Sequence, residues 1–275
     1  MKTVGIIGGT GAMGKLFKKF FQGSGFKVLL AGRRTKLSPR ELCSKSDLII
    51  FSVPIPATVK TIREFAKFAK NGSVVSDFTS IKEEPLKAMM KFAPKNCEVV
   101  GMHPLFGPSI KSLKGQTIVL VKARGNKGFN FLNNFFKKQK AKVIVCTARQ
   151  HDELMSFVQG LNHFDNLAFA LTLADSKVSM SDFEKFATPN FKLKLALVSR
   201  VLRQNPGMYA DLVFENRKAK GKVGDFSKNA LKLKSIVERK DRKALERILG
   251  KISRKFSKRS AGLFEQSNSL LEGIK

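Results

Sequence analysis

The chain has 275 residues, of which 43% are hydrophobic, so it can bury a sizeable core and has room for two domains. This composition excludes wholesale disorder, and no apolar run approaches the roughly 20 residues that span a bilayer, so no membrane attachment is expected. The net charge of +31 extends over both halves of the chain; it attracts nucleic acid, anionic membranes or multiply anionic small ligands, or it reflects a lysine bias of the proteome.

Short apolar runs alternate with helical patterns through the first half of the chain. The first run, at 4–8, ends in glycines, and a helical pattern then leads to a second run at 26–31, which is the length of a βαβ unit. This alternation predicts a parallel sheet that is covered by helices on both faces. Further strands are expected at 47–53, 73–78, 98–102, 117–121 and 142–146, and helices at 57–69 and 129–138.

The pattern changes after about residue 147, where long helical patterns replace the strands. These patterns cover 150–173, 182–204 and 240–271. The basic stretch at 217–222 is predicted to be a solvated loop. We therefore expect an α/β protein with a Rossmann-type dinucleotide-binding domain at 1–148, built on a parallel sheet, and an all-helical second domain at 149–275.

The first predicted turn between strand and helix carries a glycine pattern. Gly9, Gly11 and Gly14 fit G-x-G-x-x-G, which follows a strand and opens a helix here, as in a dinucleotide-binding fingerprint. The first glycine permits a tight turn, the second lets backbone approach a pyrophosphate, and the third lets helix pack closely on strand. With Thr10 and Met13, they are the cofactor-binding candidates at a helix N-terminus that offers N–H groups to phosphate. A glycine-rich turn without a ligand is the alternative.

Two arginines follow the second predicted strand, at the place where an NAD enzyme carries an acidic residue. An acidic residue there would hydrogen-bond the ribose 2′-hydroxyl, whereas Arg33 and Arg34 would pair with a 2′-phosphate. The sequence therefore predicts NADP as the cofactor, with NAD as the alternative. In a chain this basic, the two arginines could also lack a specific role.

Polar residues follow three more predicted strands, and ligands of open α/β sheets lie beyond the carboxyl ends of strands. His103 directly follows the run at 98–102, where it could act as a general base or cap the turn. Ser80 would lie at the same edge, where it could hydrogen-bond a substrate hydroxyl or the nicotinamide, or cap the next helix. Ser52 and Pro54 could line the cofactor's path or form a plain turn.

The other two histidines, His151 and His163, lie on the predicted helix at 150–173 and are separated by a multiple of four positions. His163, the deeper of the two, could face a cleft between the domains, and a satisfied core or interface position is the alternative for either histidine. No carboxylate or cysteine completes a metal-ligand spacing with them, so no metal is predicted. The three scattered cysteines fit no disulfide framework, and no signal-peptide pattern begins the chain, so the predicted location is the cytoplasm.

These motifs together resemble the prephenate dehydrogenase family, which includes the arogenate dehydrogenases. The resemblance covers most of the chain. It implies a Rossmann domain followed by a helical domain that dimerises, in agreement with the predicted boundary. The motifs are the glycine turn, the segment 77–82, His103-Pro104 with Phe106-Gly107-Pro108, the segment 151–163, and Asn205-Pro206-Gly207-Met208-Tyr209-Ala210-Asp211.

The resemblance also implies roles for single residues. His103 matches the histidine that polarises the ring hydroxyl, and Ser80 matches a serine near that hydroxyl and the nicotinamide. Arg200 lies nine residues before Tyr209, the spacing of the family's carboxylate-binding arginine, although a solvated helix arginine is the alternative. His163 matches a substrate-pocket histidine. Tyr209 stands where many members carry tryptophan, which leaves its contribution in doubt.

The implied reaction is the oxidative decarboxylation of prephenate, an anionic small molecule, to 4-hydroxyphenylpyruvate in tyrosine biosynthesis, with NADP as hydride acceptor and a homodimer as the active form. Arogenate dehydrogenase is the nearest alternative. The glycine turn with Gly32-Arg33-Arg34 also resembles deazaflavin-dependent NADP reductases, which lack the histidine-proline turn. A structural or regulatory NADP-binding protein is a further alternative. A basic nucleic-acid-binding protein is disfavoured because no such motif is present and the 24 Phe mostly lie at apolar-periodic positions.

Overall fold

The computed structural model describes residues 1–274 and divides into two compact units, Met1–Met155 and Ser156–Lys275. The first unit contains every strand among the described residues, and the second contains only helices and their connections. This division of secondary structure agrees with the predicted α/β class, in which an all-helical region follows a Rossmann-type sheet.

The first unit is built on a seven-stranded sheet with the order β2-β1-β3-β4-β5-β6-β7. Its strands are β1 (Thr3–Ile7), β2 (Lys27–Ala31), β3 (Leu48–Phe51), β4 (Val74–Asp77), β5 (Glu98–Pro104), β6 (Thr117–Arg124) and β7 (Lys142–Val145). Neighbouring strands are parallel except β5 and β6, so the sheet is mostly parallel rather than wholly parallel as expected. The difference arises because the connection at 105–116 contains turns and no helix, and a parallel return needs a longer crossover.

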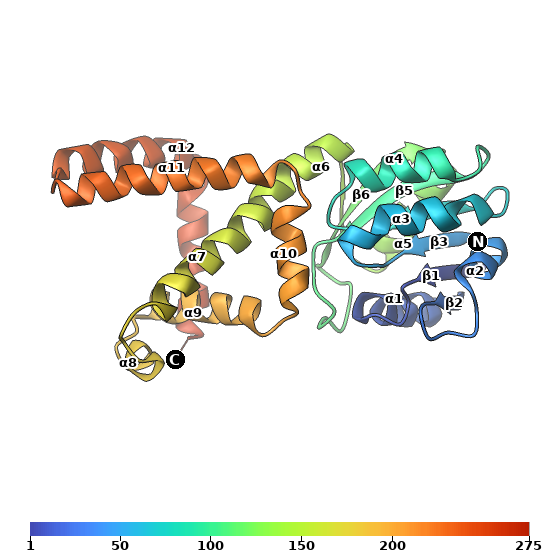
Figure 1. Ribbon diagram of the computed structural model, residues 1–275, viewed down its shortest axis with the longest axis horizontal. Coiled ribbons are helices and arrows are strands. Elements are labelled where there is room, and N and C mark those ends of the chain that lie inside the picture. The colour runs from blue at the N-terminus through green and yellow to red at the C-terminus, as the bar shows by residue number, and fades with distance from the viewer. Residues whose placement is uncertain (275) are drawn as a thin grey trace. The chain divides into compact units, whose positions relative to one another are not determined.

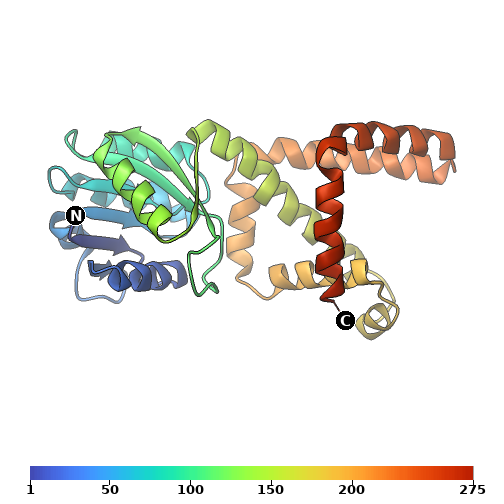
Figure 2. The same cartoon turned by 180° about the vertical axis from the view of Figure 1, so that it is seen from behind.

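Helices cover both faces of this sheet. They are α1 (Ala12–Gly23), α2 (Pro39–Lys45), α3 (Ile55–Phe65) with the 3₁₀ turn η1 (Ala66–Phe68), α4 (Glu83–Phe92), α5 (Lys127–Lys138) and α6 (Ala148–Met155). The helices α3 and α4 lie in front of the sheet in Figure 1, and α5 lies in front of it in the reverse view of Figure 2.

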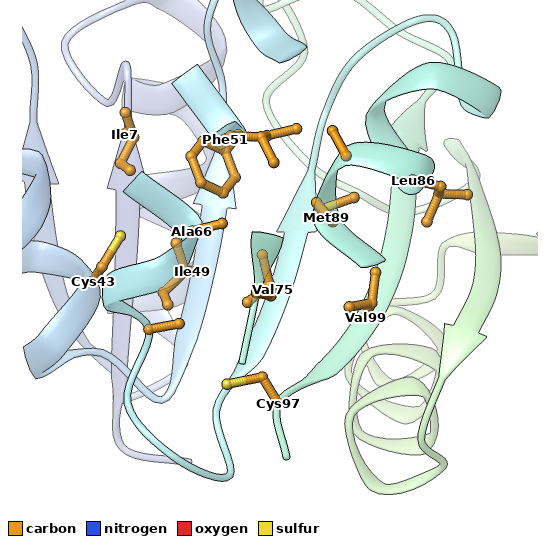
Figure 3. Packing of buried hydrophobic residues seen from close by; sticks show 14 of the residues in the cluster. Ile7, Cys43, Ile49, Phe51, Ala66, Val75, Leu86, Met89, Cys97 and Val99 are labelled. Carbon is orange, nitrogen blue, oxygen red and sulfur yellow. The ribbon is translucent and has the colours of Figure 1, made fainter. Parts of the chain in front are cut away.

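The two hydrophobic layers follow from the alternation of side chains along each strand. Ile49 and Phe51 of β3 face the layer that contains Met89 of α4, as Figure 3 shows. Leu48 and Ile50 of β3 face the other layer, where Phe17 of α1 and Phe136 of α5 are fully buried. Burial on both faces explains why a central strand such as β3 is a continuous apolar run in the sequence.

The strand register brings the carboxyl ends of the parallel strands to one edge of the sheet. In the strand register, Ile7 of β1 pairs with Ala31 of β2 and with Phe51 of β3. Asp77 of β4 pairs with Phe51 on one side and with Gly101 of β5 on the other. The segments that leave β1, β2, β3 and β4 therefore start from a common edge, where β5 also ends. This edge is where an open α/β sheet binds its ligand.

The second unit consists of helices alone within the described residues. They are the π-helical segment η2 (Ser156–Leu161), α7 (Asn162–Ala174), α8 (Met180–Lys185), α9 (Pro189–Leu202), α10 (Pro206–Phe214), α11 (Ala219–Glu238) and α12 (Arg242–Glu272). The first part of α12 runs beside α11 in both views. None of the helices within residues 1–274 combines the length and apolar character needed to cross a membrane.

Three sequence-based boundaries in this half need correction. The single helix expected at 182–204 is two helices, because Pro189 cannot continue a helix and instead starts α9, with Thr188 as its N-cap. The loop predicted at 217–222 is wrong from Ala219 onward, since that residue is fully buried and begins α11. The pattern at 150–173 is helical throughout, but η2 interrupts its α-helical register.

Candidate functional site

The carboxyl edge of the sheet gathers most of the predicted site residues of the first unit. The glycine turn leaves β1, and Arg33 and Arg34 leave β2 on one side of it. Ser52 and Pro54 leave β3 on the other side, so these three segments flank the point where the strand order reverses. Ser52 is half-buried and Pro54 is exposed.

The glycine turn packs closely against the start of α1, as a dinucleotide-binding turn requires. A Cβ atom on Gly14 would lie 2.5 Å from the Cα of Gly9, so helix and turn touch where only glycine fits. Gly9 is similarly confined, since its Cβ would lie 2.5 Å from a methyl group of Leu30. The residue of the turn with a left-handed backbone is Gly8, with φ of +79°, a conformation that favours glycine.

The start of α1 and the arginines are suited to a dinucleotide. Gly11 is the N-cap of α1 and supplies no side-chain cap, so the N–H groups of the first turn stay available to a phosphate. Thr10 and Gly11 are exposed there, and Met13 is half-buried. Arg33 and Arg34 are exposed, and neither forms an ion pair with the described residues. These features fit the phosphates and ribose of a nicotinamide dinucleotide.

His103 lies within β5 and not after it, because β6 pairs with that strand as far as Pro104 and places Val119 opposite His103. The sequence-based strand end at Met102 is therefore too early. The side chain is 2% exposed, so this histidine belongs to the interior at the sheet edge and not to a solvated turn.

His103 is connected to a second histidine and a carboxylate. Its Nδ1 lies 2.8 Å from Nε2 of His151, and Nδ1 of His151 lies 2.7 Å from Oδ1 of Asp152. The backbone N–H groups of Lys82 and Glu83 donate to the two oxygens of Asp152 over 2.7 and 2.9 Å. A carboxylate from α6 thus satisfies the N-terminus of α4, where negative charge is favoured.

That contact excludes one of the two roles considered for Ser80, the capping of α4. The N-cap position of α4 is Lys82, which makes no side-chain cap, and Asp152 accepts the N–H groups of the first turn instead. Ser80 is therefore not the cap of this helix. It is half-buried between the end of β4 and the start of α4.

A buried ion pair lies beneath the same edge. The ammonium of Lys82 donates to Asp77 and, over 2.9 Å, to the carbonyl oxygen of Met102, the residue before His103. Thr79 donates its N–H to the same oxygen of Asp77 over 2.9 Å. The side chains of Lys82 and Asp77 are completely buried. The other carboxylate oxygen of Asp77 is buried without a hydrogen-bond partner among the described residues.

The electrostatics of this cluster favour a neutral His103. Burial keeps the pKa of His103 well below its ordinary value of 6.5, and the charge of Lys82, and that of His151 whenever His151 is protonated, act in the same direction. Burial would raise the pKa of Asp152, but hydrogen bonds from His151 and from the Lys82 and Glu83 backbone lower it overall. A neutral imidazole beside an ionised carboxylate is suited to accept a proton at physiological pH.

The second unit brings together the three substrate-binding candidates of the helical half. His163 of α7 and Tyr209 of α10 meet edge to face with ring centroids 4.8 Å apart, and Tyr209 is 8% exposed. Burial raises the pKa of Tyr209, and the nearby charge of Arg200, in the last turn of α9, acts against that rise. The Nδ1 atom of His163 is buried without a hydrogen-bond partner within residues 1–274.

The sequence pattern singles out His151 without giving it a role, and it does not single out its partners Asp77, Lys82 and Asp152, which enter only as parts of motifs. The adjacent His151-Asp152 pair was a signal that could have been used, because a histidine that is oriented by a carboxylate is a recurring catalytic arrangement. Nothing in the sequence separates the buried Lys82 from the 52 basic side chains of this chain.

Two profiles of one protein family match the sequence. The profile described as prephenate dehydrogenase, nucleotide-binding domain, matches residues 32–145. The profile described as prephenate dehydrogenase, dimerization domain, matches residues 147–251. The glycine turn precedes the first match, and most of α12 follows the second.

Similar whole proteins agree with these matches. A probable arogenate/prephenate dehydrogenase of Methanocaldococcus jannaschii is 35% identical and covers 92% of this chain and 61% of its own length. The prephenate dehydrogenase [NADP(+)] of Saccharomyces cerevisiae is 25% identical, with 98% of this chain and 64% of its own length covered. The chain thus spans a little over three-fifths of the length of these relatives.

The fold has a counterpart among solved structures. The crystal structure of prephenate dehydrogenase from A. aeolicus in complex with hydroxyphenyl propionate and NAD⁺ superimposes with a TM-score of 0.73 over 94% of this chain and 98% of that one, at 20% identity. The fold and the glycine turn define a Rossmann-type dinucleotide-binding protein. Because both domain profiles match in order, the chain belongs to the prephenate dehydrogenase family, and the resemblance seen in its motifs is confirmed.

Proposed function

We propose that the chain catalyses the oxidative decarboxylation of prephenate to 4-hydroxyphenylpyruvate with NADP, a step of tyrosine biosynthesis. The observation that carries the proposal is the buried neutral imidazole of His103 at the carboxyl edge of the sheet, hydrogen-bonded to a histidine that a carboxylate holds. Family membership supplies the substrate class, since the M. jannaschii relative is named for arogenate and prephenate.

The proposed roles are those that the family resemblance implies, and each agrees with the chemistry of the side chain. His103 accepts the proton of the ring hydroxyl, and Ser80 hydrogen-bonds near that hydroxyl and the nicotinamide. Arg200 binds a substrate carboxylate through its planar fork, while His163 and Tyr209 contact the substrate in the helical unit. When bound, the nicotinamide supplies a hydride acceptor for the ring carbon that bears the hydroxyl. Loss of carbon dioxide makes the ring aromatic, so the protein mainly positions its reactants.

Gly9, Thr10, Gly11, Met13 and Gly14 would hold the cofactor's pyrophosphate at the N-terminus of α1. Ser52 and Pro54, after β3, would flank the path of the cofactor toward the nicotinamide end. The preference for NADP rests on Arg33 and Arg34, whose exposed guanidinium groups suit a 2′-phosphate. The yeast relative is named for NADP⁺, whereas the A. aeolicus structure holds NAD⁺, so the family accommodates both cofactors.

A matrix of two substrates and two cofactors tests the proposal. We expect the highest kcat/KM with prephenate and NADP. With NAD, kcat/KM should be at most about one tenth of that value, because charge-assisted hydrogen bonds to the 2′-phosphate are lost. The absorbance of the reduced cofactor at matched protein concentration measures all four rates. Equal or better efficiency with NAD contradicts the cofactor preference. If arogenate is turned over faster than prephenate, arogenate is the substrate. If neither acid is turned over, the proposed function is wrong.

We also propose that the active form is a homodimer. An apolar stripe runs along α12 at a spacing of about seven residues, which keeps it on one face of the helix. Its members, Leu249, Ile252, Phe256, Leu263 and Leu270, are 50% to 61% exposed. Exposed apolar stripes of this kind mark protein interfaces. The family's dimerisation domain, matched up to residue 251, makes a second copy of the chain the expected partner.

Replacing Phe256 by Asp is expected to convert a dimer to a monomer, since it places a charge in the middle of the stripe. Size-exclusion chromatography with light scattering measures the mass. Lys258→Asp is the matched control, because position 258 lies on the opposite face of the same helix, and it should leave the dimer intact. A monomeric wild-type protein, or a dimeric Phe256→Asp variant, contradicts the proposed interface.

A further inference from the structure

The hydrogen bonds that connect His103, His151 and Asp152 have only one direction when both imidazoles are neutral. Asp152 accepts the backbone N–H of Lys82 on the same oxygen that lies 2.7 Å from Nδ1 of His151. An ionised carboxylate has no proton to donate, so Nδ1 of His151 must carry the hydrogen of this bond. The carboxylate thereby selects the tautomer of His151.

The tautomer of His151 in turn determines the tautomer of His103. With its proton on Nδ1, a neutral His151 presents a lone pair at Nε2, which lies 2.8 Å from Nδ1 of His103. Nδ1 of His103 must therefore donate, and its Nε2 is left as an acceptor. Only a doubly protonated His151 would reverse this bond, and burial lowers the pKa of His151.

The structure holds this chain of groups rigidly at its far end. Asp152 is fixed by two backbone N–H groups of Lys82 and Glu83, so its carboxylate cannot rotate without exposing the N-terminus of α4. The side chain of His151 is completely buried, and its ring meets the ring of His103 at a centroid distance of 5.0 Å. Both histidines are almost completely buried, with exposed fractions of 2% for His103 and 1% for His151.

We propose that Asp152 and His151 are positioning residues that hold His103 in the tautomer with hydrogen on Nδ1, so that Nε2 is always ready to accept the proton of the substrate hydroxyl. The last clause rests on the proposed function, whereas the tautomer itself does not. Neither His151 nor Asp152 needs to contact substrate or cofactor. Their contribution is to remove the wrong tautomer, which would present an N–H where a base is required.

Imidazole nitrogen NMR reads the tautomers directly, and only three histidines contribute signals. A His163→Gln variant removes one set of signals and so assigns it. We expect both His103 and His151 to show hydrogen on Nδ1 in the wild-type protein without any ligand. A wild-type His103 with hydrogen on Nε2 overturns the proposal.

Two substitutions of His151 provide the functional readout. His151→Leu removes the acceptor for His103, and we expect a fall in kcat of about 10²-fold with KM changed less than about threefold, because binding groups are untouched. His151→Gln keeps an amide oxygen toward His103 and an N–H toward Asp152. Its kcat should therefore be at least about tenfold higher than that of His151→Leu. Only the Leu variant should shift the His103 signals toward the other tautomer.

The outcomes separate this proposal from the proposed function. A folded His151→Leu variant with unchanged kcat, or equal losses in the Leu and Gln variants, overturns the positioning role. If Leu unfolds the protein, the wild-type and Gln spectra still decide the tautomer. If the spectra agree with the expected tautomers but wild-type protein turns over neither prephenate nor arogenate, the positioning chain stands and the assigned reaction fails.

Discussion

His103→Asn is expected to lower kcat by about 10²- to 10⁴-fold, the usual contribution of a positioned general base. Asparagine fits the space and keeps polar atoms toward His151, but it cannot take a proton from the substrate hydroxyl. KM and NADP affinity should change little, because the glycine turn and Arg200 are untouched. Steady-state rates with prephenate and NADP, and NADPH binding by fluorescence, measure both effects. Near-normal turnover by a folded variant would show that His103 is not the base.

The pH profile of the wild-type enzyme tests the same residue. Burial, with His151 and Lys82 close by, keeps the pKa of His103 well below 6.5, so the neutral form persists at mildly acidic pH. We therefore expect kcat/KM to stay level from pH 8 to below pH 6.5 and to fall only at more acidic pH, as His103 becomes protonated. An acid limb centred at or above pH 6.5 is incompatible with this assignment.

Folding stability should also decrease as the pH falls below 6.5, because of the lowered pKa of His103. Between the lowered pKa of folded His103 and the value of 6.5 in the unfolded chain, the unfolded state binds more protons. The free energy of unfolding contributed by this histidine is therefore fully present above pH 6.5 and declines as the pH falls below it. His103→Asn should remove that part of the pH dependence, which denaturation curves at several pH values would detect.

The parts of the fold that depend on local pattern were predictable from the sequence. The strands β1 and β3 are buried apolar runs, and Gly14 follows Gly9 at the spacing that a close helix–strand contact requires. The antiparallel direction of β6 was not predictable in this way, because direction depends on the path of the connection at 105–116 and not on the strand's own residues. The π-helical register of η2 likewise has no period that a sequence pattern displays.

The candidate site likewise contains residues that the sequence pattern could predict and residues that it could not. His103 could be singled out because a histidine at the end of an apolar run is unusual, and strand order then places it at the ligand edge. Its partners could not, since His151 is 48 residues away in sequence and its contact depends on how α6 packs on α4. For Arg200, His163 and Tyr209, the family resemblance supplied the roles, and their contacts within the helical unit are consistent with a shared polar cluster.

Lys82→Met is expected to cost about 3–5 kcal/mol of folding stability, the usual effect of removing one partner of a buried ion pair. The loss leaves the Asp77 carboxylate buried without its cation and removes the hydrogen bond from Lys82 to the carbonyl oxygen of Met102. Chemical denaturation followed by far-UV circular dichroism measures the change. Lys87→Met on the same helix is the matched control, because its ion pair with Glu84 is exposed and should contribute less than about 1 kcal/mol.

The double variant Asp77→Asn with Lys82→Met separates a charge effect from a packing effect. Asparagine keeps an acceptor for the N–H of Thr79 but carries no charge, so the double variant should be more stable than Lys82→Met alone. Such a recovery would mean that Lys82 is needed to neutralise Asp77 beneath the strand edge from which His103 projects. If Lys82→Met cost no more than Lys87→Met, or if Asp77→Asn gave no recovery, the ion pair would not be what stabilises this edge.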